Sequence, residues 1–181
     1  MQEGCFCFLT PSYYIRFTDP YLMRSKEDGG GRPFFFTFRD TLHPHIMWLV
    51  PISRADNKMN KYQDVIQRKI RLYGRCDTII LGTVLGQRAA FLIQNMCPAV
   101  EQYIADIYIQ QSTNLPVAIR KQERLAVERA AKSVWARIKR KAEAEAGEGK
   151  PISKNGFVFP DIFSIYMELL RDFPAPQQPE N

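Results

Sequence analysis

The side chains best suited to chemistry follow an apolar run that begins at Trp48. Immediately after this run come groups that donate hydrogen bonds and mostly carry positive charge, namely Ser53, Arg54, Lys58, Lys61 and Tyr62. A guanidinium presents a planar fork of donors to phosphate oxygens, and a serine hydroxyl can bond the same oxygens. Pro51 has no N–H for a sheet hydrogen bond, so a strand through it must bend or reach an edge there, which places Ser53 at a strand exit. The pattern predicts a phosphate-binding site at this exit.

The same segment could also move protons. Lys58 and Lys61 are candidates for a general base or acid, and Tyr62 could position a ribose. Two other interpretations stay open. Ser53 could hydrogen-bond its own backbone, as hydroxyl residues often do. Tyr62 could pack into the core, because it falls on the apolar face of a predicted helix.

Positive charge is in excess over the whole chain and clusters in three segments. The 181 residues include 25 Lys and Arg against 19 Asp and Glu, for a net charge of +6. The segments are the predicted strand exit, a predicted helix that carries Arg68 and Lys69, and a long basic C-terminal helix that carries Arg120, Lys121, Arg124 and Lys132. A groove between these segments would attract a polyanion such as RNA. A plain solvated helix face accounts for the charges of the long helix equally well.

Several other kinds of site are disfavoured by the sequence. His43 and His45 fit turn residues at the surface and would supply two metal ligands at most, and the aspartates are scattered, so neither a metal nor a cofactor is expected. The sequence has no Walker-type phosphate loop and no nucleophile elbow around Ser53. The cysteines, at positions 5, 7, 76 and 97, are expected to be reduced thiols. With no secretory signal and no apolar run of about 18 residues, we expect a cytoplasmic protein without a membrane partner.

Hydrophobic periodicity predicts an α+β fold in one domain, residues 1–173, followed by a flexible tail, residues 174–181. The predicted strands cover residues 5–9, 34–38, 46–52, 78–84 and 88–93, with a hairpin over 34–52 and a glycine turn at 85–87. The predicted helices cover residues 11–17, 60–73, 100–108, 116–146 and 161–173. Residues 26–31, with three glycines, are predicted to be a mobile loop, residues 143–151 a linker, and residues 94–95 a cap on the sheet.

The order of several short motifs resembles that of the toxins of type III toxin–antitoxin systems, the family that includes ToxN, AbiQ, CptN and TenpN. The motifs are Leu-Thr-Pro-Ser-Tyr-Tyr at residues 9–14, Arg-Pro-Phe at 32–34, the strand that leads to Ser53, and Asn-Met-Cys-Pro at 95–98. The resemblance covers residues 5–109, and the C-terminal helices match only in type.

This resemblance implies a metal-independent endoribonuclease on a compact, antiparallel, β-barrel-like core of the PemK type, decorated with helices. It also implies a small RNA pseudoknot, encoded as a tandem repeat, as the antitoxin, with toxin and RNA in a hetero-oligomeric assembly. Such toxins slow growth or abort phage infection. By position, Arg32 matches the family's basic residue before the first hairpin strand, and Ser53 matches its serine. The family's preceding threonine is Ile52 here, and its loop lysine corresponds to Arg54 or Lys58.

Arg32, Ser53, Arg54 and Lys58 are therefore the expected catalytic group. Metal-free cleavage of RNA uses the ribose 2′-hydroxyl as the nucleophile, so the protein must align that hydroxyl, stabilise charge on the phosphoryl oxygens and move two protons. Lys61, Tyr62 and the basic residues of the two helices would hold the mRNA substrate or the antitoxin RNA. The alternatives are a non-catalytic RNA-binding module and a protein-interaction domain whose charge only keeps it soluble.

Overall fold

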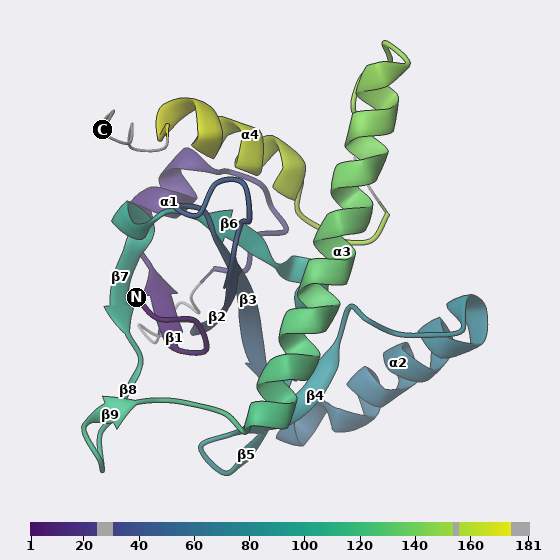
Figure 1. Ribbon diagram of the computed structural model, residues 1–181. Helices are drawn as coiled ribbons and strands as arrows, with labels where there is room; N and C mark the ends of the chain where they lie inside the picture. The colour runs from purple at the N-terminus through teal and green to yellow at the C-terminus, as the bar shows by residue number, and fades with distance from the viewer. Residues whose placement is uncertain (25–30, 154–155, 175–181) are drawn as a thin grey trace.

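A computed structural model describes residues 1–24, 31–153 and 156–174 of the chain (Figure 1). The sheet strands are β1 (Phe6–Leu9), β2 (Phe34–Arg39), β3 (Met47–Arg54), β4 (Ile80–Val84), β5 (Gln87–Phe91), β6 (Cys97–Ala99) and β7 (Ile104–Ile107), and β8 (Ile109–Gln110) pairs with β9 (Leu115–Pro116) in a separate ribbon. The helices are α1 (Pro11–Arg16), α2 (Met59–Tyr73), α3 (Lys121–Gly147) and α4 (Ile162–Asp172), with 3-10 turns η1 (Asp56–Lys58), η2 (Ile93–Asn95) and η3 (Glu101–Tyr103). Almost all of the predicted mobile loop and of the predicted flexible tail lies outside the described residues.

The central strand is β3, because it is paired along both edges. One edge is covered by β2, from the pair Phe34–Pro51 to the pair Arg39–Met47. The other edge is shared in series by β6, opposite residues 47–49, and β5, opposite residues 52–54. Pro51 lies where the partner changes, and its carbonyl accepts a hydrogen bond from the Leu92 N–H at 3.0 Å. The irregularity predicted at Pro51 is thus a change of partner strand.

The sheet is open rather than closed. Its strand order is β4-β5-β3-β2-β1-β7, with β6 on β3, and among the described strands the two outer ones, β4 and β7, do not pair. The expected barrel-like closure is therefore wrong for the described strands and the PemK-type core stays a prediction, whereas the α+β class with a mostly antiparallel sheet is confirmed. Because β5 and β6 share one edge of β3, the sheet divides into two arms there instead of curling onto itself.

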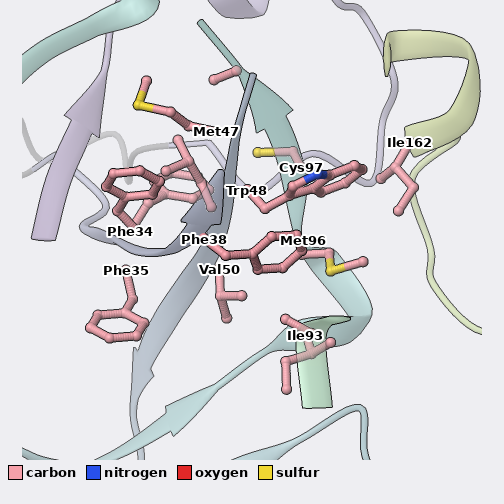
Figure 2. Close-up of a cluster of buried hydrophobic side chains, with 14 of the residues drawn as sticks. Phe34, Phe35, Phe38, Met47, Trp48, Val50, Ile93, Met96, Cys97 and Ile162 are labelled. Atoms are coloured by element: carbon pink, nitrogen blue, oxygen red, sulfur yellow. The ribbon is translucent and has the colours of Figure 1, made fainter. Parts of the chain in front are cut away.

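One face of the sheet packs against α3 and α4. The rings of Trp48 in β3 and Trp135 in α3 lie 4.3 Å apart, and Tyr166 of α4 stacks on Trp48 at 6.0 Å. Figure 2 shows the Trp48 ring reaching from β3 toward Ile162, where α4 begins. Side chains alternate along a strand, so Ile52 points to the same face as Trp48. Trp48, Trp135 and Tyr166 all belong to the larger core cluster, and Ile52 packs against it.

The other face carries a smaller apolar cluster covered by α2. Ala90 of β5 is fully buried in this cluster, and Tyr62 and Val65 of α2 pack against it. Ser53 is paired with Ala90, and directly paired residues of antiparallel strands point to the same side. Ser53 therefore lies on the face covered by α2 and opposite α3.

Most predicted elements are confirmed. All five predicted strands form, the β2–β3 hairpin is antiparallel, and α2 ends at Gly74, whose φ of 72° suits a glycine. The β4–β5 turn also has positive φ, at Leu85 and Gly86. The long helix begins five residues later than predicted, because residues 115–116 pair with β8, and it extends to Gly147 through part of the predicted linker. The four cysteines are free thiols, as expected.

The helix predicted over residues 100–108 is wrong. This segment forms η3 and then β7, which pairs with the outer edge of β1. The Tyr108 N–H donates to the Phe6 carbonyl at 2.8 Å, and the Thr10 N–H donates to the Tyr103 carbonyl at 2.9 Å. An unpaired strand edge is a stronger influence here than the helical spacing of the apolar residues.

Candidate nucleic-acid site

Arg32 and Ser53 meet where β2 begins and β3 ends. The Ile52 N–H donates to the Pro33 carbonyl at 3.2 Å, and the Arg32 Nη1 donates to the Ile52 carbonyl at 2.9 Å. Continuing the β2–β3 register by two pairs beyond Phe34–Pro51 places Arg32 opposite Ser53. The Ser53 hydroxyl makes a 3.3 Å hydrogen bond to the Arg54 carbonyl, so the interpretation of Ser53 as a residue that bonds the nearby backbone also holds.

The Arg32 guanidinium is half-buried among backbone carbonyls and tyrosines. Its Nε donates to the Arg24 carbonyl at 3.2 Å. Burial lowers the pKa of Arg32 below its usual value, and the hydroxyls of Tyr14 and Tyr62 oppose this shift. Tyr14 and Tyr62 therefore lie within electrostatic range of Arg32. The arrangement fixes a cation in place at the strand exit.

Tyr14 connects α1 to this cation. Its hydroxyl donates to the Met23 carbonyl at 3.1 Å, and burial raises the pKa of that hydroxyl well above its usual value. The Arg24 guanidinium carbon lies 5.8 Å from the centroid of the Tyr14 ring. The sequence pattern missed both residues as site residues. Tyr14 is part of the opening motif at residues 9–14, whereas Arg24 has no local signal, because only the folded chain brings it to Arg32.

The other predicted residues near the strand exit are distributed along η1 and α2. Lys58 ends η1 and precedes α2, and Lys61 and Arg68 are exposed on α2. Tyr62 is half-buried against the smaller cluster, so it packs, as the alternative interpretation held, and it lies within electrostatic range of Arg32. Within the described residues the amines of Lys58 and Lys61 form no ion pair with a carboxylate.

Lys69 has a structural position. Its amine donates to the Thr78 hydroxyl at 2.6 Å and to the Gln94 side-chain carbonyl at 3.2 Å. Burial lowers the pKa of Lys69 below its usual value. These bonds hold α2 onto the segment before β4 and onto η2, and the RNA contact predicted for Lys69 stays a prediction. Gln94 takes the predicted role at the end of the sheet.

Arg54 and the basic residues of α3 lie on the opposite face. Arg54 is paired with Ala89 of β5, and Ala89 is paired with Gly82 of β4. Glu123 of α3 packs against Gly82 and accepts a hydrogen bond from the Thr83 N–H at 2.9 Å. These three paired residues therefore face α3. Four RNA contacts were predicted on or beside α3. Arg120 immediately precedes the helix, Lys121 begins it, and Arg124 and Lys132 lie within it, with Arg124 packed against Gly4. Lys132 is 2.7 Å from a Glu128 oxygen and stands over the Phe38 ring. The basic residues thus divide between two faces instead of lining one groove.

The histidines lie far from the strand exit along the hairpin. His43 and His45 precede β3, and their rings are 6.1 Å apart. Both are half-buried at the turn before β3, and His43 lies beside Tyr166 of α4. In the part of the chain that the structure describes, no group of three or more His, Cys, Asp or Glu could hold a metal ion. Of the described helices, none is long and apolar enough to cross a bilayer.

Among known proteins, the chain matches solved structures but no family model or curated sequence. Among solved structures, the chain is similar to AbiQ, a lactococcal anti-phage endoribonuclease belonging to the type-III toxin-antitoxin system, with a TM-score of 0.61. The similarity covers 94% of this chain and 98% of the AbiQ chain, at 11% sequence identity. The chain therefore has the fold of AbiQ, and the resemblance extends through the C-terminal helices.

Proposed function

We propose that this chain is an endoribonuclease toxin of the type III toxin–antitoxin kind, which cleaves single-stranded RNA without a metal. The observation that supports this most is the hydrogen bond from Arg32 to the Ile52 carbonyl, next to Ser53 at the exit of β3, on a chain with the fold of an endoribonuclease. In this proposal the ribose 2′-hydroxyl attacks the adjacent phosphate, the 5′-oxygen of the next nucleotide leaves, and the upstream product ends in a 2′,3′-cyclic phosphate.

Arg32 would stabilise the charge on the phosphoryl oxygens. Two of its N–H groups are held by the carbonyls of Arg24 and Ile52. Its remaining N–H groups form no other hydrogen bond within the described residues and can donate to a phosphate. A guanidinium that is already oriented needs little rearrangement as charge develops in the transition state. Ser53, opposite Arg32, would bond the same phosphate.

Lys58 and Tyr62 are the proposed groups for proton transfer and ribose alignment. Lys58 follows the strand exit on η1, where a 3-10 turn anchored by the Ala55 carbonyl fixes its backbone. Tyr62 comes one helical turn later and lies near the Arg32 guanidinium. Arg54 would contribute charge from the other face, near the sheet's end.

The proposed partners are RNAs in the cytoplasm. A small pseudoknot RNA would act as the antitoxin, and mRNA would be the substrate, with toxin and antitoxin in a hetero-oligomeric assembly. The net charge of +6 supports a polyanionic partner. The cations of Lys61, Arg68, Arg120, Lys121 and Arg124 would contact phosphates away from the cleaved bond.

The test compares cleavage of single-stranded RNA by site variants in excess chelator. We expect Ser53→Ala and Lys58→Ala each to reduce the rate by about 10²-fold, which is the scale for one lost contact to a developing charge. Ser112→Ala and Lys139→Ala are matched controls, because both residues lie away from the strand exit, on the β8–β9 ribbon and on α3. Full activity in both site variants would remove this site from consideration. Tight, salt-sensitive RNA binding without products would favour the non-catalytic RNA-binding module.

A further inference from the structure

A shallow depression adjoins the phosphate site on the side of α1. It has a volume of about 340 Å³ and is lined by Leu9, Pro11, Tyr14, Ile15 and Arg24. Two of these residues also surround Arg32: the Arg24 carbonyl accepts its Nε, and the Tyr14 hydroxyl opposes the lowering of its pKa. The depression and the proposed phosphate site are therefore neighbouring parts of one surface.

We propose that this depression is a nucleobase subsite, which holds the base of a nucleotide next to the phosphate bound at Arg32. The inference rests on the proposed function and adds to it the part of the substrate that confers sequence preference. The occupant is one unpaired base of single-stranded RNA. Nothing in the sequence pattern or in the fold similarity assigns a role to these five residues.

The lining has the chemistry that a flat aromatic base requires. The Arg24 guanidinium lies 5.8 Å from the centroid of the Tyr14 ring, which forms a cation–aromatic pair at the edge of the depression. Ile15 is 78% exposed although it is apolar, and Pro11 is exposed beside it. Aromatic rings, guanidinium planes and apolar side chains are the surfaces on which unpaired bases stack in RNA-binding proteins.

The walls of the depression are fixed relative to the phosphate site. The Tyr14 hydroxyl holds the Met23 carbonyl at 3.1 Å, which ties α1 to the segment that carries Arg24. Arg32 then ties that segment to β3 through its bonds to the carbonyls of Arg24 and Ile52. A base in the depression and a phosphate at Arg32 would be held by one connected set of hydrogen bonds. The volume is at the lower end of the range for small-ligand pockets, which suits a single base better than a protein segment.

The test uses the full-length chain and two readouts. In the first, products from a randomised single-stranded RNA pool are sequenced to give the nucleotide preference at each position around the cut. In the second, a short 2′-O-methyl RNA containing 2-aminopurine is titrated by fluorescence, since this RNA has no free 2′-hydroxyl to attack. Arg24→Ala and Ile15→Ala truncate exposed side chains, so they should leave the fold intact.

We expect each variant to flatten the preference at one position beside the cut, to raise KM and the Kd for the 2-aminopurine RNA about tenfold, and to leave kcat unchanged. Leu42→Ala is the matched control, because Leu42 is an exposed apolar residue outside the site, and it should behave as the wild type. Unchanged positional preferences and unchanged Kd in both variants would overturn the subsite while leaving the proposed nuclease intact. If the wild type cleaves no RNA, the proposed function fails, and an unchanged Kd in the variants then overturns the subsite separately.

Discussion

Lys69 is held by partners within the protein, whereas Lys61 on the same helix is exposed. The Lys69 amine is shared between the Thr78 hydroxyl and the Gln94 side chain. We predict that Lys69→Met lowers the free energy of unfolding by about 1–3 kcal/mol, because the buried Thr78 hydroxyl and the half-buried Gln94 side chain lose a partner. The RNA affinity of the folded protein should stay unchanged. Urea unfolding and RNA filter binding measure the two quantities.

Lys61→Met is the matched control for that prediction, since Lys61 is an exposed lysine of the same helix. It should weaken RNA binding and leave the free energy of unfolding within about 0.5 kcal/mol of the wild type. A Lys69→Met variant that unfolds like the wild type, or that loses RNA affinity as Lys61→Met does, would show that Lys69 contacts RNA after all.

His45 makes the stability of the protein depend on pH. Burial, and then the neighbouring His43, lower the pKa of His45 below its ordinary value of 6.5, while the Phe173 backbone and Asp40 oppose the shift. The folded state therefore binds fewer protons at this ring than the unfolded chain does. Stability consequently rises with pH through the window below 6.5, and the full penalty lies below the lowered pKa.

Replacing His45 by phenylalanine should therefore reduce the rise in the urea midpoint between about pH 5 and pH 7. His43→Gln serves as the control, because the sequence has 2 histidines and this variant keeps His45. It should retain most of the rise. Identical pH profiles for the wild type and His45→Phe would mean that His45 titrates alike in the folded and unfolded chain.

The site residues that could be predicted from the sequence are those with a local signal. Ser53 follows a strand that Pro51 interrupts, and that pattern places it at an exit. Tyr14 and Arg24 could not be found in this way, because their position beside Arg32 depends on hydrogen bonds to backbone carbonyls outside the helices and strands, which no sequence pattern predicts. The structural partners of Lys69 could not be found from its local sequence either, since they lie before β4 and in η2.

The basic residues of α3 lie on the sheet face opposite Ser53, so their contribution should be to affinity alone. The double variant Arg120→Ala/Lys121→Ala should raise the Kd for single-stranded RNA and reduce the slope of log K against log salt by about 0.7 for each lost phosphate contact. At saturating RNA kcat should be unchanged. Salt titrations and single-turnover cleavage measure these effects.

A second pair on the same helix provides the control for α3. Lys139 is 3.9 Å from a Glu143 oxygen, and Arg140 bonds the Ala136 carbonyl within its own helix. Lys139→Ala/Arg140→Ala removes the same charge farther along the helix and should leave the salt slope unchanged. Equal losses of affinity for the two pairs would indicate a general effect of net charge rather than a contact surface at the start of α3.

Helices and strands were predicted correctly where the spacing of apolar residues agrees with the tertiary contacts of the segment. The β7 segment, where the two disagree, was predicted wrongly. The stripe along α3, which includes Val127, Val134 and Ile138, is buried as its spacing indicates. The segment that forms β7 has a helical spacing as well, but it lies beside the free edge of β1 and forms a strand. Which strand a segment pairs with depends on the tertiary structure, and the spacing of apolar residues along the chain does not reveal it.

At the scale of the molecule, β3 organises both faces. It pairs with three strands, places Trp48 in the larger core, and ends at Ser53 on the opposite face. The composition and strand pattern were sufficient for the α+β class. They were insufficient for the open sheet, because sheet closure depends on how β5 and β6 divide one edge of β3.

The most direct test of the central claim is cleavage, in excess chelator, of an RNA oligonucleotide that carries a single 2′-deoxyribose at the cut position. The account predicts that the all-ribose RNA is cut to leave a 2′,3′-cyclic phosphate, and that the deoxy substitution blocks this bond while RNA affinity is retained, because only the internal nucleophile is lost. Cleavage of the deoxy-substituted bond, or products that end in a 3′-hydroxyl, would contradict the account.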